Sequence, residues 1–270
     1  MACDLSYCRH LGIDLQADLG VIDEWTLVNK MAINIEKCVV VHFGTNYFGH
    51  RYHLNGTFLG SSDSFKDLGI IIDNKLKFHK HVDLVRLRAY RAINLIFRLF
   101  QLKDSEIYYK LYKIYVIPII FYGLPIYLTN TRKCIDNIER IQRYFTKRLF
   151  KRTHPNQAVL HYPDRLKYFG LYPLEASLVI NDLSVLFKII NKIVGSPIAP
   201  VFSAIRPSRL IVQNITSSIS RNWFYHRSLT LWNQFVANHY HTPFTNYSLF
   251  QNFLSKHISS FAYGSVIKAL

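Results

Sequence analysis

The sequence has few of the residues that mark secreted or low-complexity proteins. Its four cysteines, at positions 3, 8, 38 and 134, form no CxxC pair, and disulfide-dense secreted domains carry more of them. Glycine (11) and proline (9) are also scarce, which excludes collagen-like chains. Because Asp4 and Arg9 interrupt the first apolar stretch, we predict no signal peptide. We expect free thiols and an intracellular chain, nuclear or cytoplasmic.

The motifs of common enzymes are absent as well. The sequence contains neither GxxxxGK[ST] nor GxGxxG, the loops that cradle phosphates, and neither HExxH nor GxSxG. Its twelve histidines show no spacing that predicts a set of metal ligands. The residues alone therefore indicate no active site.

The low number of acidic residues is the most informative feature of the composition. Lys and Arg number 33 against 17 Asp and Glu, a net charge of +16. Residues 1–75 hold 6 basic and 9 acidic residues, whereas residues 76–155 hold 17 and 5. A charge step of this size predicts a functional boundary near residue 76. The basic part indicates a polyanionic partner, either nucleic acid or an anionic membrane surface.

Half of the residues are hydrophobic, so the chain buries a core. We predict a predominantly helical α+β fold with three regions: residues 1–76, a small unit with a hairpin; 77–155, a basic helical domain; and 156–270, a helical and irregular region. The first region is expected to hold a helix over 14–30, strands over 38–43 and 65–73, and a hairpin over 52–59 that turns at Asn55-Gly56. Helices are expected over residues 79–100, 106–122, 131–152, 163–169, 173–194 and 223–236.

The helix over residues 131–152 has two different faces. At 100° per residue, Ile135, Gln142, Phe145 and Leu149 all fall within about 60° of Ile138. On the opposite side fall four cations: Arg140, Arg143, Lys147 and Lys151. An ordinary solvated face mixes charges of both signs. This stripe therefore predicts either a solvated helix or a polyanion-binding one.

Residues 114–131 are uncharged and are a candidate membrane span. A spanning helix needs about 20 apolar residues, and this stretch contains Pro118, Gly123 and Pro125. We favour a buried helix that breaks near Gly123.

Short motifs follow one another in a fixed order along nearly the whole chain. They are Met1-Ala2-Cys3-Asp4, Asp14-Leu15-Gln16-Ala17-Asp18-Leu19, Trp25, Asn34, Lys37-Cys38, residues 52–59, Lys66-Asp67-Leu68-Gly69, Leu76 with Phe78 and His81, Gln142-Arg143-Tyr144-Phe145-Thr146-Lys147, Arg165-Leu166-Lys167, Leu171, Leu174-Glu175, and Arg227 with Leu231-Trp232-Asn233. Each is weak alone. In this order they resemble the reverse transcriptases of Jockey-like non-LTR retrotransposons, from the end of the palm through the thumb and the region that follows.

The resemblance implies two groups of functional residues. The family's primer grip corresponds to Tyr52, Leu54, Asn55, Gly56, Lys66, Leu68 and Gly69. The thumb would lie along an RNA–DNA hybrid or RNA and contact phosphates, without sequence specificity, through Arg86, Arg88, Arg91, Arg98, Arg140, Arg143, Lys147, Arg148, Lys151 and Arg152. The resemblance implies neither a membrane partner nor an oligomeric state.

The departures from the family concern catalysis. The family has two adjacent aspartates, which correspond here to Cys3 and Asp4. Mg²⁺ prefers oxygen ligands, so a thiol at Cys3 leaves the metal-ligand set incomplete, and no cofactor is expected. The chain is therefore expected to be a truncated RNA-directed DNA polymerase that cannot polymerise alone and retains at most template–primer binding.

Three alternatives remain open from the sequence. In the first, the chain would be a nucleic-acid-binding module that a host has taken over from such an element. In the second, it would be a membrane-associated protein that uses residues 114–131. The third alternative is that the reading frame continues upstream of Met1 into a longer polymerase.

Overall fold

The computed structural model describes residues 5–44, 50–128, 131–196, 200–205, 209–212, 223–236 and 246–257, with side chains from Leu15 onward except at 235 and 236. The chain divides into two compact units, residues 1–78 and 79–270, which are described separately. Helices predominate and the strands are short, which confirms the predicted fold class.

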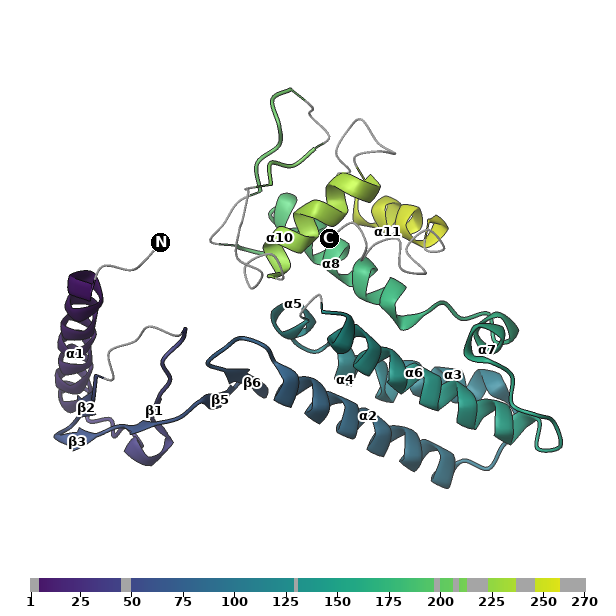
Figure 1. Ribbon diagram of the computed structural model, residues 1–270, viewed down its shortest axis with the longest axis horizontal. Helices are drawn as coiled ribbons and strands as arrows, with labels where there is room; N and C mark the ends of the chain where they lie inside the picture. Colours follow the sequence, from purple (N-terminus) through teal and green to yellow (C-terminus); the bar gives the residue numbers. More distant parts are fainter. Residues whose placement is uncertain are drawn as a thin grey trace. The chain divides into compact units, whose positions relative to one another are not determined.

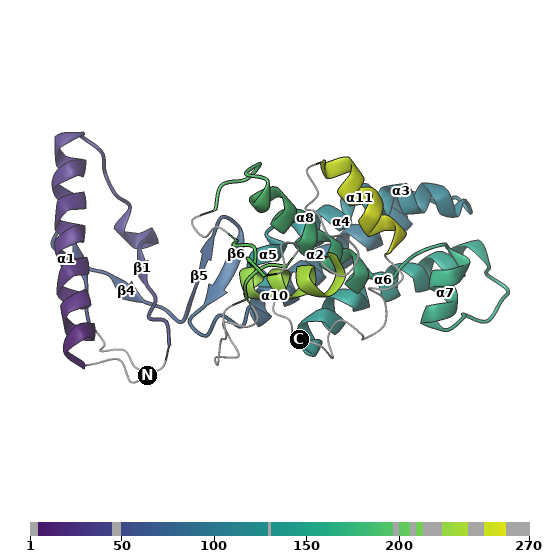
Figure 2. The same cartoon turned by 90° about the horizontal axis from the view of Figure 1, so that it is seen from above.

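The first unit combines one long helix with three two-stranded sheets. In chain order its elements are α1 (Leu5–Val28), the 3₁₀ turn η1 (Ile35–Lys37), β1 (Val39–Val40), β2 (His53–Leu54), β3 (Thr57–Phe58), β4 (Gly60–Ser61), β5 (Ser64–Asp67) and β6 (Ile70–Asp73). Strand β1 pairs with β4 in parallel, whereas β2–β3 and β5–β6 are antiparallel hairpins. The last of these is visible in Figure 2 as two adjacent arrows.

The two hairpins turn in the same way. The predicted Asn55-Gly56 turn is confirmed, with φ of 48° and 72°. The predicted single strand over residues 65–73 is wrong, because Leu68 and Gly69, with φ of 44° and 89°, reverse the chain between β5 and β6. Two positive φ angles are typical of the type I′ turn. The predicted strand over 38–43 shortens to β1.

Leu68 is a costly residue for this turn, since a bulky side chain at positive φ is strained. Its side chain is 81% exposed, so little burial is lost when it is replaced. We expect Leu68→Asn to raise the free energy of unfolding by about 1 kcal/mol, measured by urea denaturation. Leu68→Ala is the control, because alanine retains the strain; equal stability of the two variants would contradict the prediction.

Side chains from α1 hold the β2–β3 hairpin. The Gln16 amide donates to the His53 carbonyl (3.0 Å) and accepts from the His53 amide (3.0 Å). The Asp23 carboxylate accepts from the Asn55 amide at 2.5 Å. Gln16 belongs to the ordered motifs, and here its contacts position the hairpin.

The second unit is helical (Figure 1). Its elements are α2 (His79–Leu99), α3 (Ser105–Tyr115), α4 (Ile117–Phe121), α5 (Leu124–Tyr127), α6 (Arg132–Thr153), α7 (Tyr162–Tyr168), α8 (Leu174–Ile190), α10 (Phe224–Leu231), the π-helical turn η2 (Trp232–Val236) and α11 (Tyr247–Lys256). The continuous helix predicted over 106–122 is wrong. It stops at Tyr115 because Pro118, which has no amide hydrogen, cannot continue the hydrogen-bond ladder and instead lies in the first turn of α4.

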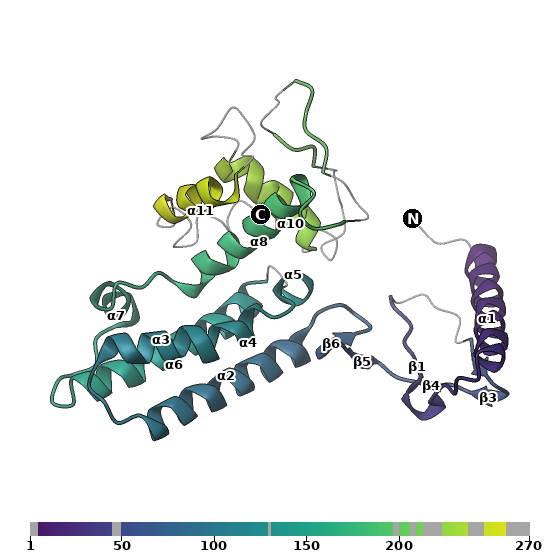
Figure 3. The same ribbon diagram turned by 180° about the vertical axis from the view of Figure 1, so that it is seen from behind.

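Aromatic side chains build two cores in this unit. Between α2, α3 and α6, Phe97 stacks on Tyr108 (ring centroids 4.7 Å apart) and Tyr112 on Phe145 (4.1 Å). Between α8, η2 and α11, Phe187 and Trp232 both stack on Phe250. Figure 3 shows α8, α10 and α11 gathered around this second core. We did not predict α11, although Asn246 caps it through hydrogen bonds to the Ser248 and Leu249 amides.

Candidate nucleic-acid interface

The two faces predicted for α6 are present in the structure. Its apolar face, with Ile135, Ile138, Gln142, Phe145 and Leu149, is buried against neighbouring helices. The four side chains predicted on the opposite side are all exposed to solvent: Arg140, Arg143, Lys147 and Lys151. Burial of the apolar face fixes the rotation of α6 and so turns these cations outward.

Helix α2 lies beside α6 and runs in the same direction (Figure 1). The Tyr90 and Tyr144 rings are 4.8 Å apart, and the Tyr144 hydroxyl donates to Asn94 Oδ1 at 2.6 Å. Further along both helices, Arg152 Nη2 donates to the Phe97 carbonyl at 2.9 Å. These contacts make a polar seam that sets the register of the two helices.

Two predicted phosphate-binding cations belong to this seam. Arg148 donates to Asn94 Oδ1 and to the Tyr144 hydroxyl, and its guanidinium lies 5.0 Å from the Phe97 ring centroid. Arg152 is partly buried and bonded to α2 as described above. Both side chains therefore join α6 to α2, and any phosphate contact would have to share them with these bonds.

The cations predicted on α2 are also placed at the surface. Arg88, Arg91 and Arg98 are exposed, while Arg86 is half-buried and paired with Asp83 at 3.1 Å. Burial raises the pKa of the Tyr90 hydroxyl, and the positive fields of Arg86 and Arg140 oppose that rise. A cation of α2 and a cation of α6 thus both lower the pKa of the same tyrosine in the seam.

We define the cationic surface as the exposed basic side chains of the two helices that were predicted to bind phosphate: Arg88, Arg91, Arg98, Arg140, Arg143, Lys147 and Lys151. Within the part of the chain that the structure describes, no ion pair involves any of them. Arg140 donates to Asn137 Oδ1 at 3.2 Å, and the Arg143 guanidinium lies 4.8 Å from the Tyr162 ring centroid. Their positive charge is therefore not neutralised by the fold.

A buried carboxylate anchors the other side of α6. Glu139 accepts from the Tyr162 hydroxyl and from the Leu174 and Glu175 amides, which open α8 (3.1 and 2.9 Å). Burial raises the pKa of Glu139, and these hydrogen bonds oppose that rise. The N-terminus of α8 thus carries a carboxylate cap supplied by α6.

Most of the ordered-motif residues in this unit make structural contacts. Gln142 Nε2 donates to the Tyr172 carbonyl at 2.7 Å, and buried Arg165 donates to the Leu160 and Arg143 carbonyls (2.6 and 3.3 Å). Asn233 exchanges two 2.8 Å hydrogen bonds with the backbone of Leu210. Sequence reasoning missed these roles, because most of these contacts join positions about 20 to 30 residues apart in the chain.

The predicted primer-grip residues lie at or beside the two hairpin tips of the first unit. Tyr52 and Leu54 are buried there, and Asn55 and Gly56 form the β2–β3 turn. Lys66 is exposed on β5, next to the turn made by Leu68 and Gly69. Their contact with a primer stays a prediction.

The catalytic remnant, Cys3 and Asp4, lies outside the described residues. Among the residues that are described, no three His, Cys, Asp or Glu side chains come together as a metal site would require. Among the described cysteines, neither Cys38 nor Cys134 forms a disulfide bond.

Residues 114–128 fold as the end of α3, then α4 and α5, with Val116, Ile120, Leu124 and Tyr127 buried in the unit. In the described parts of the chain, no helix has both the length and the apolar character needed to cross a membrane.

Comparison with known proteins finds distant relatives, each similar to about half of the chain. An uncharacterized protein of Caenorhabditis elegans is 28% identical over 145 residues, which are 54% of this chain and 71% of that protein. RNA-directed DNA polymerase from mobile element jockey is 28% identical over 142 residues in Drosophila funebris and 29% identical over 141 residues in Drosophila melanogaster. Each of these two matches covers 50% of this chain and only 15% of the polymerase. No family model and no solved structure matches the chain. The chain is thus a distant relative of reverse transcriptases.

Proposed function

We propose that this chain derives from the C-terminal part of a Jockey-like reverse transcriptase and binds nucleic acid without sequence specificity through its cationic surface. The observation that carries the proposal is the set of exposed cations on α2 and α6 that no acidic side chain of the described residues neutralises. The distant similarity to the jockey polymerases supports a nucleic-acid ligand over other polyanions.

The spacing of the cations on α6 suits a phosphate backbone. An α-helix rises about 1.5 Å per residue, so Arg140 and Lys151 lie about 16 Å apart along the axis. This distance corresponds to about five phosphates of one strand in a duplex, which follow one another every ~3.4 Å along its axis. Four side chains long enough to adjust can therefore each reach a different phosphate, with no contact to base edges.

We propose further that these 270 residues do not polymerise by themselves. In the family resemblance, Cys3 stands where the first aspartate of a metal-binding pair is found. A carboxylate provides a hard oxygen ligand for Mg²⁺ and a thiol does not. The hairpins around Asn55-Gly56 and Leu68-Gly69 would then contact a primer end without any chemistry following.

We expect affinity for an RNA–DNA hybrid to fall steeply with salt. If the seven cations each contact one phosphate, the slope of log affinity against log salt is about −6. Fluorescence anisotropy of a labelled hybrid, titrated with the full chain between 50 and 300 mM salt, measures it. An affinity that does not change with salt would overturn the binding proposal.

Primer extension tests the catalytic part separately. We expect the full chain to incorporate no nucleotide above background on the same hybrid with Mg²⁺ or Mn²⁺, because the metal-ligand set is incomplete. An active reverse transcriptase serves as the positive control. Incorporation by this chain would contradict the proposal that it cannot polymerise.

A further inference from the structure

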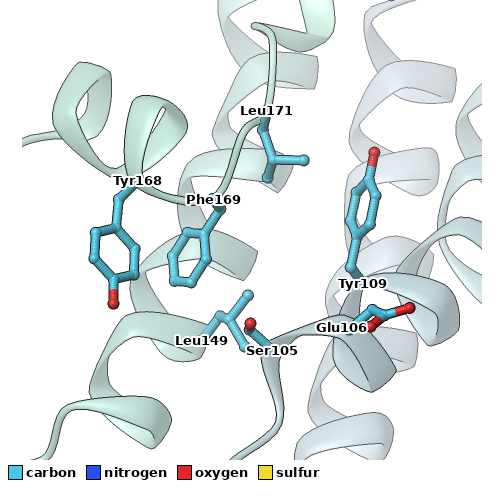
Figure 4. Close-up of a pocket in the computed structure, with 7 residues that line it drawn as sticks. All are labelled: Ser105, Glu106, Tyr109, Leu149, Tyr168, Phe169 and Leu171. Carbon is cyan, nitrogen blue, oxygen red and sulfur yellow. The ribbon is translucent and has the colours of Figure 1, made fainter.

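A pocket of about 390 Å³ lies between α3, the end of α6 and the residues that follow α7. Figure 4 shows Tyr109 on one side of it and Tyr168 and Phe169 on the other, with Leu149 and Leu171 between them. Its volume is at the lower end of those that hold small ligands. We call this pocket the aromatic slot, and its volume suits one flat ring system.

The aromatic walls are held in place by contacts with one another and with neighbouring side chains. The Tyr168 hydroxyl is hydrogen-bonded to His154 Nε2 at 2.9 Å, and the Tyr168 and Phe169 rings are perpendicular, with centroids 5.1 Å apart. On the other wall, Lys113 Nζ lies 4.4 Å from the Tyr109 ring centroid. The slot is therefore preformed, and a ring that enters it does not have to order these side chains first.

Polar groups gather at one end of the slot. Figure 4 places the Ser105 hydroxyl and the Glu106 carboxylate there. Glu106 is paired with Lys110 at 2.8 Å, and both side chains are exposed. This end of the pocket thus offers a carboxylate that can accept from an amino group, with the Lys110 cation beside it.

We propose that this pocket binds one unpaired nucleobase of a single-stranded segment, preferring bases with an exocyclic amino group. The aromatic rings would stack on the base, as they do in proteins that bind single strands. The Glu106 carboxylate would accept from an amino group such as N4 of cytosine, which uracil lacks. The proposal rests on the nucleic-acid binding proposed above and adds a second contact to it.

The base has to be unpaired because of where the pocket lies. Leu149, in the pocket, is two residues from Lys147, so the pocket and the cationic surface lie on opposite sides of α6. A duplex bound to the cationic surface cannot also place a stacked base in the pocket. A single strand leaving the duplex could pass the last turn of α6, from Lys151 to His154 and on to Tyr168.

Three labelled hairpin duplexes test the proposal with the full chain. One is blunt, one carries a three-cytidine overhang, and one carries three abasic residues, which retain the phosphates but not the bases. We expect the cytidine overhang to bind about tenfold tighter than the abasic one. Phe169→Ala and Tyr109→Ala are each expected to remove this difference and leave blunt-duplex affinity unchanged. Tyr115→Ala, which removes an exposed tyrosine of the same helix, should retain it.

Further results would overturn the pocket, the role of Glu106 or the proposed function separately. Equal affinity for cytidine and abasic overhangs would overturn the pocket, even if the blunt duplex binds with the expected salt dependence. A uridine overhang should bind more weakly than the cytidine one in the wild type but not in Glu106→Ala; equal binding in the wild type would overturn the role of Glu106. If the blunt duplex does not bind, the proposed function fails. The pocket is then judged by saturation-transfer NMR with cytidine 5′-monophosphate, whose base signals should respond to the wild type and not to Phe169→Ala.

Discussion

Arg227→Ala is expected to lower the free energy of unfolding of the second unit by about 3–5 kcal/mol, the usual cost of breaking a buried ion pair. Arg227 and Asp182 are both almost fully buried, with Nε 2.6 Å from Oδ2 and Nη2 3.1 Å from Oδ1. Without the guanidinium, the Asp182 carboxylate stays buried with no compensating charge. In a unit of this size the loss corresponds to a decrease of about 10 °C in Tm.

The effect is large because Arg227 connects three helices. From α10 it reaches Asp182 on α8, and its Nη1 and Nη2 atoms donate to the Leu128 and Pro125 carbonyls beside and within α5 (2.7 and 3.3 Å). The side chain is fully buried, so water cannot replace these bonds without opening the unit. Arg227 therefore joins α10 to α8 and to α5, the short helix that precedes α6 in the chain.

A double-mutant cycle separates the ion pair from simple loss of packing. We expect Arg227→Met and Asp182→Leu each to destabilise strongly, and the double variant to be less destabilised than the two effects summed, because it leaves no unpaired buried charge. Urea denaturation followed by circular dichroism measures all four proteins. Strict additivity of the two single effects would contradict the role given to the pair.

The parts of the fold that follow from the sequence are those set by neighbouring residues. Asn55-Gly56 specifies its own turn, and the spacing from Ile135 to Leu149 specifies which side of α6 is buried. Asp104 caps α3 by accepting from the Glu106 amide, and aspartate is one of the residues preferred at that position. Local patterns of this kind need no knowledge of what lies across the core.

The features that the sequence did not predict depend mainly on contacts between segments that are distant in the chain. Leu68 gives no signal for a turn, and the β5–β6 hairpin forms because its two halves pair strongly enough to hold a leucine at positive φ. In the sequence, Arg148 resembles any other cation of α6, but in the structure its guanidinium contacts Asn94 and Phe97 of α2 as well as Tyr144 of its own helix. The aromatic pocket could not be predicted at all, because three separate segments line it.

In the candidate interface, too, one part follows from the local sequence and another part depends on long-range contacts. Periodicity alone identifies the four cations of α6 as one face, since a helix with a single buried side must expose the opposite one. It does not tell which cations are already used by the fold. The structure shows that Arg148 and Arg152 are bonded to α2, whereas the four cations of that face are exposed. A binding experiment should therefore replace those four side chains.

The variant that replaces Arg140, Arg143, Lys147 and Lys151 together by alanine is expected to lose about a thousandfold in affinity for a nucleic-acid duplex at 0.15 M salt. Each phosphate contact contributes about 0.9 to the slope of log affinity against log salt, so the slope should become less steep by about 3.6. If this contribution vanishes near 1 M salt, it amounts to a factor of about 10³ at 0.15 M. A salt series by fluorescence anisotropy yields both quantities.

The matched control removes the same charge elsewhere in the second unit. Lys103, Lys167, Lys192 and Lys256 are exposed and lie outside α2 and α6, so their replacement by alanine lowers the net charge equally. We expect this control to retain most of the affinity and nearly all of the slope, since distant charges act only through a screened field. If the two quadruple variants lose affinity and slope equally, binding depends on net charge alone and the cationic surface is not the site. All four side chains of the α6 set are exposed, and the contact of Arg143 with the Tyr162 ring contributes about 1 kcal/mol at such a site, so both variants should stay folded, which a thermal melt checks. A difference in affinity between the two folded variants then reports on phosphate contact.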